Sequence, residues 1–424
     1  MAFDEESYNQ QIARDYRWNF AVSALDGVFY WFGISFVSGS TVIPVYAARL
    51  TSNPVVIGLI TAIASSGWFL PQLLTANLVE RLPRRKPLVV VAGFLLERLP
   101  FLLLAISTYL FAVPYRKLAL ALLLLFYAWH SYGAGFLATA WQDMIAKIIP
   151  SRRRGRFFGI SNFGGAALGV LGAQATARIL ARYDFPDNFA LCMLCGFALV
   201  SLSWLFLAMT REPAYPPQKE RISHGQYWRS LPRLLRADRN FRHYLAARAL
   251  TGFSRMASVG LAAVYAVERW HLPDQQAGVF TTILLIAQTV LNLAFGYLGD
   301  QKGHKLSLEL GIAGWAAAMA AALWAPNPLL FSLLFFAGAG AATASELVAG
   351  PLVLLEFASP ADRPTYIGLG NTTTGIFSAI APLVGGWLAA LFGYRPLFAI
   401  ALVLTAVAWG VMRWAVREPR HLHV

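Results

Sequence analysis

Long apolar runs separated by short polar turns dominate the chain from residue 19 onward. A helix needs about 20 apolar residues to cross the hydrocarbon core, and more when it is tilted. The runs are continuous and show no alternation of the kind found in β-barrel strands, so helices are expected. The pattern predicts twelve membrane-spanning helices, at residues 19–47, 55–79, 88–112, 117–148, 157–182, 188–210, 241–267, 275–299, 306–325, 328–356, 365–391 and 396–415.

A short charged turn between two of these runs has a counterpart in the first half of the chain. The later copy reads Gly296-Tyr-Leu-Gly-Asp300-Gln-Lys-Gly303-His-Lys305, and the earlier copy reads Ala76-Asn-Leu-Val-Glu80-Arg-Leu-Pro83-Arg-Arg85. The glycines, or Pro83, allow the backbone to reverse between helices. Other pairs match at comparable offsets: Gly58 with Gly278, Arg154 with Arg363, Gly159 with Gly368 and Asn162 with Asn371. The chain is therefore a tandem of two related halves.

The composition is that of a membrane protein. Hydrophobic residues make up 57% of the 424 residues, charged residues make up 13%, and the mean hydropathy of +0.54 is too high for a soluble protein of this size. The net charge of +14 would suit nucleic acid, but most of the 35 Lys and Arg residues fall in turns on the side of both termini. This asymmetry predicts a multi-pass protein of the cytoplasmic (inner) membrane with both termini in the cytoplasm. Anionic lipid headgroups are its expected neighbours, and no nucleic acid is expected as a partner.

One long polar segment, residues 211–240, divides the spans into two sets of six. Its first part carries three prolines, and its second part interleaves basic with apolar residues. That second part has the composition of an amphipathic surface helix, but a solvated linker is the simpler interpretation. We therefore expect a cytoplasmic N-terminal segment (1–18), an N-terminal six-helix bundle (19–210), a cytoplasmic linker (211–240), a C-terminal six-helix bundle (241–415) and a cytoplasmic tail (416–424).

The paired turns resemble a motif of the major facilitator superfamily, Gly-x3-Asp-(Arg/Lys)-x-Gly-x-(Arg/Lys)-(Arg/Lys), which joins the second and third helices and recurs more weakly between the eighth and ninth. The resemblance implies an all-α membrane protein with 12 transmembrane helices in two pseudo-symmetric six-helix bundles. It also implies charge networks at the cytoplasmic helix ends that hold the inner face closed. For Asp143, a local pair with Lys147 four residues later is an equally good explanation. The resemblance gives this gating role to Glu80, Arg81, Arg84, Arg85, Asp143, Arg154, Gly296, Asp300, Gly303, Lys305, Glu356 and Arg363.

Four ionisable residues lie inside the spans that, by the same resemblance, line a central cavity: Asp26, His130, Arg255 and Glu346. A charge inside the bilayer costs a few kcal/mol, so each of these requires a partner or a function. We expect Arg255 and Glu346 to face one water-filled cavity, where Arg255 attracts an anionic or polar substrate or pairs with Glu346. Glu346 or Asp26 then carries a proton. A static Arg255–Glu346 pair, a solvated Asp26 and a His130 that only bonds between helices remain alternatives.

The remaining buried groups have simpler interpretations. Glu97 and Arg98 lie in the third span, where we expect a structural role against neighbouring helices. Arg248 lies nearer the cytoplasmic end of its span and is expected to extend its charged end toward water. Cys192 and Cys195, inside an apolar run, are expected to pack rather than to act in redox chemistry.

These features predict a secondary active transporter that moves a small molecule by alternating access, coupled to protons. The chain has no Gly-x4-Gly-Lys-(Ser/Thr) loop, no metal-ligand cluster and no nucleophile constellation, so we expect neither an enzyme nor a cofactor. A proton-independent facilitator and a non-transporting receptor or scaffold of the same fold are the alternatives. Efflux of amphipathic compounds and uptake of a small polar nutrient both remain open. The expected partners are the small-molecule substrate, protons and membrane lipids, and the chain is expected to be a monomer.

Overall fold

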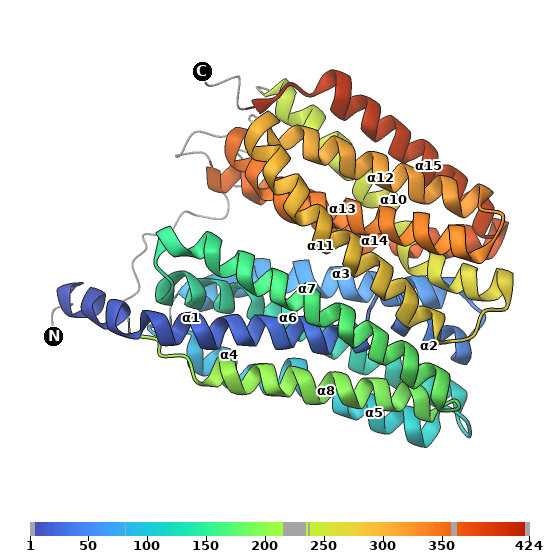
Figure 1. Cartoon of the computed structure of the whole chain (residues 1–424), viewed down its shortest axis with the longest axis horizontal. Helices are drawn as coiled ribbons and strands as arrows, with labels where there is room; N and C mark the ends of the chain where they lie inside the picture. Colours follow the sequence, from blue (N-terminus) through green and yellow to red (C-terminus); the bar gives the residue numbers. More distant parts are fainter. Residues whose placement is uncertain (1–4, 81, 215–234, 236–237, 358–362, 420–424) are drawn as a thin grey trace. The chain divides into compact units, whose positions relative to one another are not determined.

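The computed structural model describes residues 5–80, 82–214, 235, 238–357 and 363–419, which are helical apart from short turns (Figure 1). In this part of the chain, 11 helices are long and apolar enough to cross a membrane. The first long helix, α1 (Glu5–Phe36), is additional to those eleven. The protein is therefore the all-helical, multi-pass membrane protein that we predicted. The expected amphipathic stretch of the linker lies outside the described residues except for Leu235.

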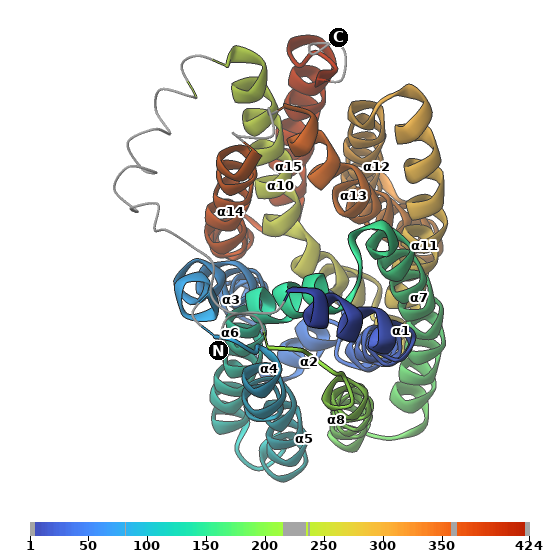
Figure 2. The same ribbon diagram turned by 90° about the vertical axis from the view of Figure 1, so that its left-hand side faces the viewer.

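The chain divides into two compact units, of which the N-terminal unit comprises residues 1–51 and 63–220. In it, α1 packs against α7 (Ser151–Arg182) and α8 (Asp187–Ala208). Helix α5 (Leu99–Phe111) packs against α8 and also against α6 (Arg116–Ile148). Figure 2 shows α8 lying beside both α5 and α1. Helix α8 therefore packs between α1 and α5.

The C-terminal unit comprises residues 52–62 and 221–424, so α3 (Pro54–Glu80) contributes to both units. Helix α10 (Arg239–Trp270) packs against α14 (Arg363–Phe392) and α15 (Tyr394–Gly410). Helix α12 (His304–Trp324) packs against α15 and α13 (Pro328–Phe357), and α11 (Gln276–Lys302) also packs against α13. The two units repeat the same packing. The first span of each packs on the fifth and sixth spans, as α1 does on α7 and α8 and α10 does on α14 and α15. The third span of each packs on the fourth and sixth, as α5 does on α6 and α8 and α12 does on α13 and α15. This repeated packing confirms the pseudo-symmetric pair of bundles.

The first predicted span, which we expected to be continuous from 19 to 47, is interrupted at residues 37–41. Helix α1 ends at Phe36, and a separate helix, α2, covers Val42–Leu50. Ser38 and Ser40 flank Gly39 in the turn, and the Ile43 N–H bonds to the Ser38 carbonyl oxygen at 3.0 Å. A side chain at Gly39 would overlap the Tyr127 hydroxyl. The prediction of a single helix was wrong because hydropathy does not register a turn formed by small residues within an apolar run.

The third predicted span contains one widened helical turn. Helix α4 (Lys86–Gly93) leads into a π-helical turn, η1 (Phe94–Arg98), and then into α5. Pro100 follows this turn, and a proline ring in a regular α-helix clashes with the carbonyl four residues earlier. In η1 the Leu99 N–H bonds to the Phe94 carbonyl, five residues earlier, rather than to the carbonyl four residues earlier as in an α-helix. Such turns are frequent at functional sites, and this one carries Glu97 and Arg98.

An asparagine in each unit's first long helix, Asn19 in α1 and Asn240 in α10, holds the segment that follows the sixth span of that unit. Asn19 Nδ2 donates to the Arg211 carbonyl oxygen at 2.9 Å, and Asn19 Oδ1 accepts from the Arg211 N–H at 2.8 Å. Asn240 makes the same two bonds with Arg417, at 3.0 and 2.7 Å. Each arginine begins an Arg-Glu-Pro tripeptide, at 211–213 and 417–419. We did not predict this copy of the repeat from the sequence.

Replacement of either asparagine is expected to destabilise its unit to a similar degree. Asn19→Ala and Asn240→Ala each remove two hydrogen bonds to the backbone, which contribute about 1 kcal/mol each to the free energy of unfolding. Thermal unfolding of the purified chain, followed by tryptophan fluorescence, measures the loss against Gln10→Ala, an exposed polar side chain. Equal stability of all three variants would contradict a holding role for the asparagines.

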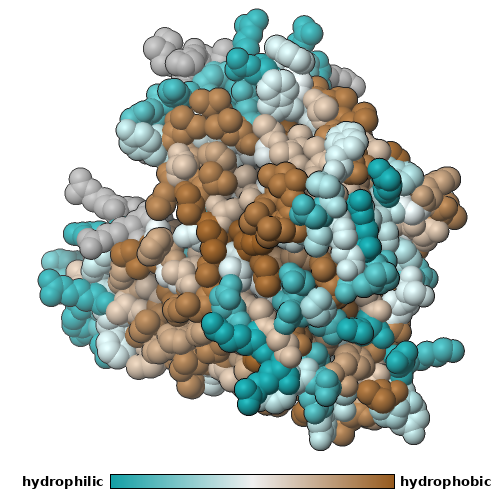
Figure 3. All heavy atoms as spheres, turned by 45° about the vertical axis from the view of Figure 1, so that its right-hand side comes forward, coloured by the Kyte–Doolittle hydropathy of each residue, from teal (hydrophilic) through white to brown (hydrophobic). Residues whose placement is uncertain are grey.

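Large apolar side chains cover much of the visible surface in Figure 3. On α11, for example, Val290 is 59% exposed and Leu293 is 65% exposed. Contiguous apolar surface of this extent is rare on soluble monomers and marks contact with a partner or a membrane. In a multi-pass protein these side chains meet lipid acyl chains.

Candidate functional site

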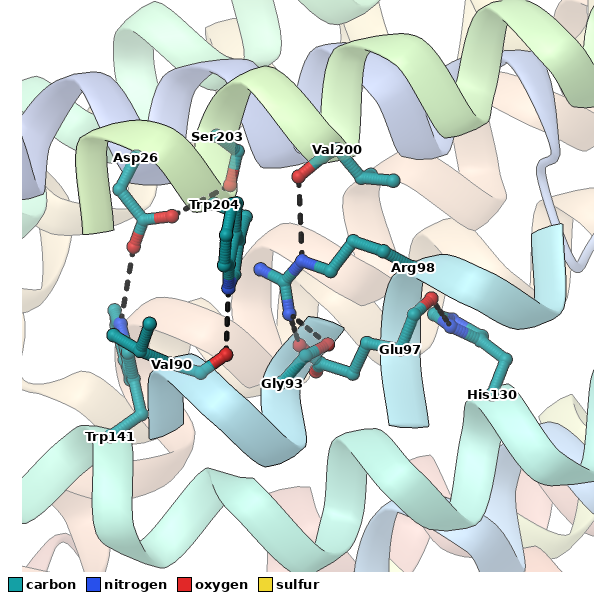
Figure 4. Close-up of polar contacts among 10 residues, drawn as sticks. All are labelled: Asp26, Val90, Gly93, Glu97, Arg98, His130, Trp141, Val200, Ser203 and Trp204. Atoms are coloured by element: carbon teal, nitrogen blue, oxygen red, sulfur yellow. Dashed lines mark hydrogen bonds and ion pairs between the residues drawn. The ribbon is translucent and has the colours of Figure 1, made fainter. Parts of the chain in front are cut away.

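Asp26 is held inside the N-terminal unit by side chains from two other helices (Figure 4). Its carboxylate accepts from the Ser203 hydroxyl of α8 at 2.6 Å and from Trp141 Nε1 of α6 at 3.3 Å. The residue is only 4% exposed. An indole N–H can only donate, so the observed contacts satisfy both carboxylate oxygens as acceptors.

Arg98 is another buried charge of this unit and lies on the π-helical turn η1. It forms an ion pair with Glu97, and its guanidinium donates to the Gly93 carbonyl at 3.2 Å and the Val200 carbonyl at 3.4 Å. The guanidinium also lies 5.9 Å from the centre of the Tyr30 ring. Because Val200 is on α8, Arg98 ties the third predicted span to the sixth (Figure 4). The structural role expected for Glu97 and Arg98 agrees with these contacts.

His130 on α6 completes this group of polar residues. Its Nδ1 is 2.9 Å from the Glu97 carbonyl oxygen, and because a carbonyl only accepts, Nδ1 carries the hydrogen. The imidazole also packs 4.2 Å from the Phe101 ring, measured between ring centres. Asp26 and His130 are thus both engaged with residues of their own unit, and the cavity role that we expected for them stays a prediction.

A pocket within the C-terminal unit contains three charged side chains. Arg248 and Arg255 reach it from α10, and Glu346 reaches it from α13. Arg248 Nη2 lies 3.2 Å from Glu346 Oε2, and Arg255 Nη1 donates to the Thr343 hydroxyl at 3.5 Å. Glu346 keeps 25% of its side chain exposed, against 12% for Arg248. The pocket therefore places a carboxylate and two guanidinium groups around one open space.

The Glu346 carboxylate pairs with Arg248. We had expected Arg255 either to attract the substrate or to pair with Glu346, and we had expected Arg248 to extend toward water. The two arginines are spaced i, i+7 on α10, so both project from the same face of that helix. Arg248 contacts Glu346, while Arg255 contacts Thr343, about one turn from Glu346 on α13. The i, i+7 spacing in the sequence could have identified Arg248.

A charge network joins helix ends in the N-terminal unit, at the end that we expect to face the cytoplasm. Arg85 Nε lies 2.7 Å from Asp143 Oδ2, and Lys147 Nζ lies 3.7 Å from both Asp143 and Glu212. Glu212 also accepts the backbone N–H groups of Arg85 at 3.0 Å and Lys86 at 2.6 Å. A carboxylate is well placed at a helix N-terminus, and Lys86 begins α4. Glu212 was missed because it lies beyond the last predicted residue of its span.

The corresponding end of the C-terminal unit has its own network. Lys305 Nζ lies 3.1 Å from Glu309, which also pairs with Arg413 at 3.4 Å. His304 Nε2 lies 3.8 Å from Glu356. The turn depends on Gly303, whose φ of 94° is a conformation that other residues rarely adopt.

Several residues of the expected gating set have no described surroundings. Arg81 lies outside the described residues, as do the side chains of Glu80, Arg154, Asp300 and Arg363. Arg84 is described and exposed, and Gly296 lies at a point where an added Cβ would be 3.9 Å from Val348. The gating role of the whole set stays a prediction.

Asp15 lies in the part of α1 that precedes the expected membrane span. Burial alone would raise the pKa of its carboxyl group, but hydrogen bonds from Arg211 and Arg14 lower that pKa below its usual value. Arg211 Nη1 is 3.1 Å from Asp15 Oδ1. Asp15 therefore stays ionised and adds a charge interaction beside the Asn19–Arg211 contact.

Comparison with known proteins gives one family and several transporters. The sequence profile described as Major Facilitator Superfamily matches residues 24–269 and 244–424. A putative sugar efflux transporter of Deinococcus radiodurans is 25% identical over 252 residues, which are 59% of this chain and 62% of that protein. The multidrug resistance protein MdtG of Dickeya zeae is 31% identical over 144 residues, 34% of each chain. The chain thus matches less than two thirds of the length of either relative.

The solved structure of a D-xylose–proton symporter superposes with a TM-score of 0.68 at 16% identity. The match covers 95% of this chain and 98% of the symporter. At this identity the similarity concerns the fold alone.

Proposed function

The chain belongs to the major facilitator superfamily, and from this premise we propose that it is a proton-coupled secondary active transporter that moves a small molecule across the cytoplasmic membrane. In this proposal the two six-helix units alternate between inward and outward access around a substrate site, with both termini in the cytoplasm. The fold alone does not select a substrate, so the proposal depends on the chemistry of the site.

The observation that carries the proposal is the charged pocket of the C-terminal unit. Arg248, Arg255 and Glu346 lie within long apolar helices, where ionisable groups are costly and commonly serve transport. Small and hydroxyl-bearing residues such as Thr251, Gly252 and Ser378 complete the lining, which suits a small polar solute. We therefore assign the substrate site to this pocket.

Glu346 is a better proton carrier than Asp26 on geometric grounds. Glu346 lines the pocket with a quarter of its side chain exposed, so water in the pocket can deliver or remove a proton. Asp26 is 4% exposed and enclosed by Ser203 and Trp141. Loss of the Glu346 charge would also release Arg248, which links protonation to the state of the substrate site.

Transport in proteoliposomes with an imposed pH gradient tests this function against a panel of sugars, sugar acids and amphipathic drugs. The native chain is expected to accumulate at least one compound, and Arg255→Ala and Glu346→Gln are each expected to reduce gradient-driven accumulation at least about tenfold, since each removes one charge of the site. Glu346→Gln is expected to retain exchange of substrate across the membrane without net accumulation. Arg182→Ala and Glu6→Gln, at exposed positions, are the matched controls.

Three results would contradict the proposal at different levels. Equal transport with and without the pH gradient would indicate a proton-independent facilitator. Absence of transport for every compound would favour a receptor or scaffold of the same fold. Native rates in both Arg255→Ala and Glu346→Gln would show that the substrate site lies elsewhere.

A further inference from the structure

The charges that line the pocket do not balance. Of its lining residues only Arg248, Arg255 and Glu346 carry full charges, so with Glu346 ionised the pocket holds one excess positive charge. Arg248 is neutralised by Glu346 at 3.2 Å. Arg255 makes no ion pair within 4 Å among the described residues; the Glu346 carboxylate acts on it only at longer range, and its one hydrogen bond there is to the Thr343 hydroxyl at 3.5 Å. Two guanidinium groups that share one carboxylate within apolar helices leave a positive charge that an anion can neutralise.

The hydroxyl groups around the pocket add a second requirement. Thr251 donates its hydroxyl hydrogen to the Ala247 carbonyl, Ser345 to the Ala342 carbonyl and Thr374 to the Gly370 carbonyl, at 2.9 Å in each case. With those hydrogens used within their own helices, the three oxygens are left to accept hydrogen bonds from a bound molecule. A solute that carries hydroxyl groups meets this requirement.

We infer that the pocket binds a small hydroxylated organic monoanion of the sugar-acid type, anchored by Arg255, and that Glu346 binds the coupled proton cooperatively with it. This inference rests on the proposed transport function and names the substrate class and the coupling of the same site. In the empty pocket Arg248 is occupied by Glu346. A proton from pocket water converts the Glu346 carboxylate to a neutral carboxylic acid, the ion pair breaks, and Arg248 becomes the second ligand of the substrate carboxylate.

Other ionisable groups near the pocket do not replace Glu346 in this role. On α10, the Tyr244 hydroxyl is 3.5 Å from Arg248 Nη1 and is fully buried. On α12, the charged group nearest in sequence to the lining residues Gly311 and Ile312 is Glu309, which is held by Lys305 and Arg413. Helix α14 contributes the uncharged Thr374 and Ser378. Glu346 is thus the one carboxylate among the lining residues.

The charge balance defines what crosses the membrane. The empty pocket carries one excess positive charge, and so does the pocket loaded with one proton and one monoanion. Each cycle therefore carries a proton and a monoanion in the same direction with no net charge. Binding of either partner strengthens binding of the other by the same factor, because linkage between two sites is reciprocal.

Binding to the purified full-length chain in detergent, measured by isothermal titration calorimetry, tests the inference without requiring transport. Glucuronate, glucose and glucosamine are the probes, since they share a hydroxylated ring and differ in charge. The native chain is expected to bind glucuronate at least about tenfold more tightly than either other probe, and more tightly at acidic than at alkaline pH. Arg255→Gln is expected to abolish the preference for glucuronate, and Glu346→Gln, which mimics the protonated acid, to retain tight binding but lose its pH dependence.

Arg182→Gln, an exposed arginine, controls for the loss of a positive charge, and the elution profile of each variant on size exclusion checks its folding. Binding of glucose or glucosamine as tight as that of glucuronate, or absence of glucuronate binding, would overturn the substrate class. A preference that survives in Arg255→Gln would overturn the anchor, and pH dependence that survives in Glu346→Gln would overturn the coupling. Failure of the transport function would appear instead as native chain that binds glucuronate but does not move it.

Discussion

Arg98→Met is expected to lower the free energy of unfolding of the N-terminal unit by about 3 to 5 kcal/mol, the range for removal of one partner from a buried ion pair. The reason is that Glu97 would lose its counter-charge at a site where Arg98 is only 2% exposed. The bonds from Arg98 to the Gly93 and Val200 carbonyls would be lost as well. Thermal or denaturant unfolding of the purified chain, followed by tryptophan fluorescence, measures the change.

A double variant separates the lost charge from the lost packing. Glu97→Gln combined with Arg98→Met removes both charges of the pair and is expected to recover part of the stability that Arg98→Met loses. Arg182→Met, an exposed arginine, is the control for the substitution itself. A double variant no more stable than Arg98→Met alone would show that the ion pair is not the source of the effect.

Gly135→Ala is expected to destabilise the N-terminal unit by about 3 kcal/mol, because the added methyl group has no space. A Cβ at Gly135 on α6 would overlap the carbonyl oxygen of Gly67 on α3 and lie 2.8 Å from the Trp68 carbonyl oxygen. These are backbone atoms, so relief requires the two helices to move apart. Small residues at such crossings let membrane helices approach closely, and van der Waals contact is what holds them together in lipid.

Gly159→Ala is the matched control for this prediction. It lies on α7, and an added Cβ there would meet nothing within 4 Å. The general preference for alanine over glycine in helices, about 1 kcal/mol, therefore makes Gly159→Ala neutral or stabilising. Thermal unfolding of both variants in the same detergent gives the comparison, and an equal loss of stability in both would contradict the crossing as the cause.

Much of the fold could be predicted because the membrane imposes simple rules on the sequence. Long apolar runs identified the helices, and the paired turns at Glu80 and Asp300 identified the repeat. The turn at residues 37–41 and the π-helical turn η1 could not be predicted in this way. Both depend on local backbone geometry, through Gly39 in one case and Pro100 in the other, and a hydropathy average does not contain that information.

The candidate site was predicted in part. The cost of a charge in an apolar run singled out Arg255 and Glu346, and both line the pocket. The same rule singled out Asp26 and His130, which bond to Ser203 and to the Glu97 carbonyl oxygen and whose cavity role stays a prediction. Arg248, which pairs with the Glu346 carboxylate, was expected to extend toward water, because the depth of a residue along its helix does not show which side chains meet.

The sequence by itself determined that this chain is a membrane protein of two related halves, and which residues carry charge into the apolar interior. These properties follow from composition and residue order, because the polarity of a residue determines whether it favours water or lipid, whatever side chains it packs against. Only the tertiary structure decided which charges meet. That Glu346 pairs with Arg248 and leaves Arg255 without a carboxylate depends on how α13 lies along α10, because partners less than 4 Å apart are set by helix packing rather than by position in the chain.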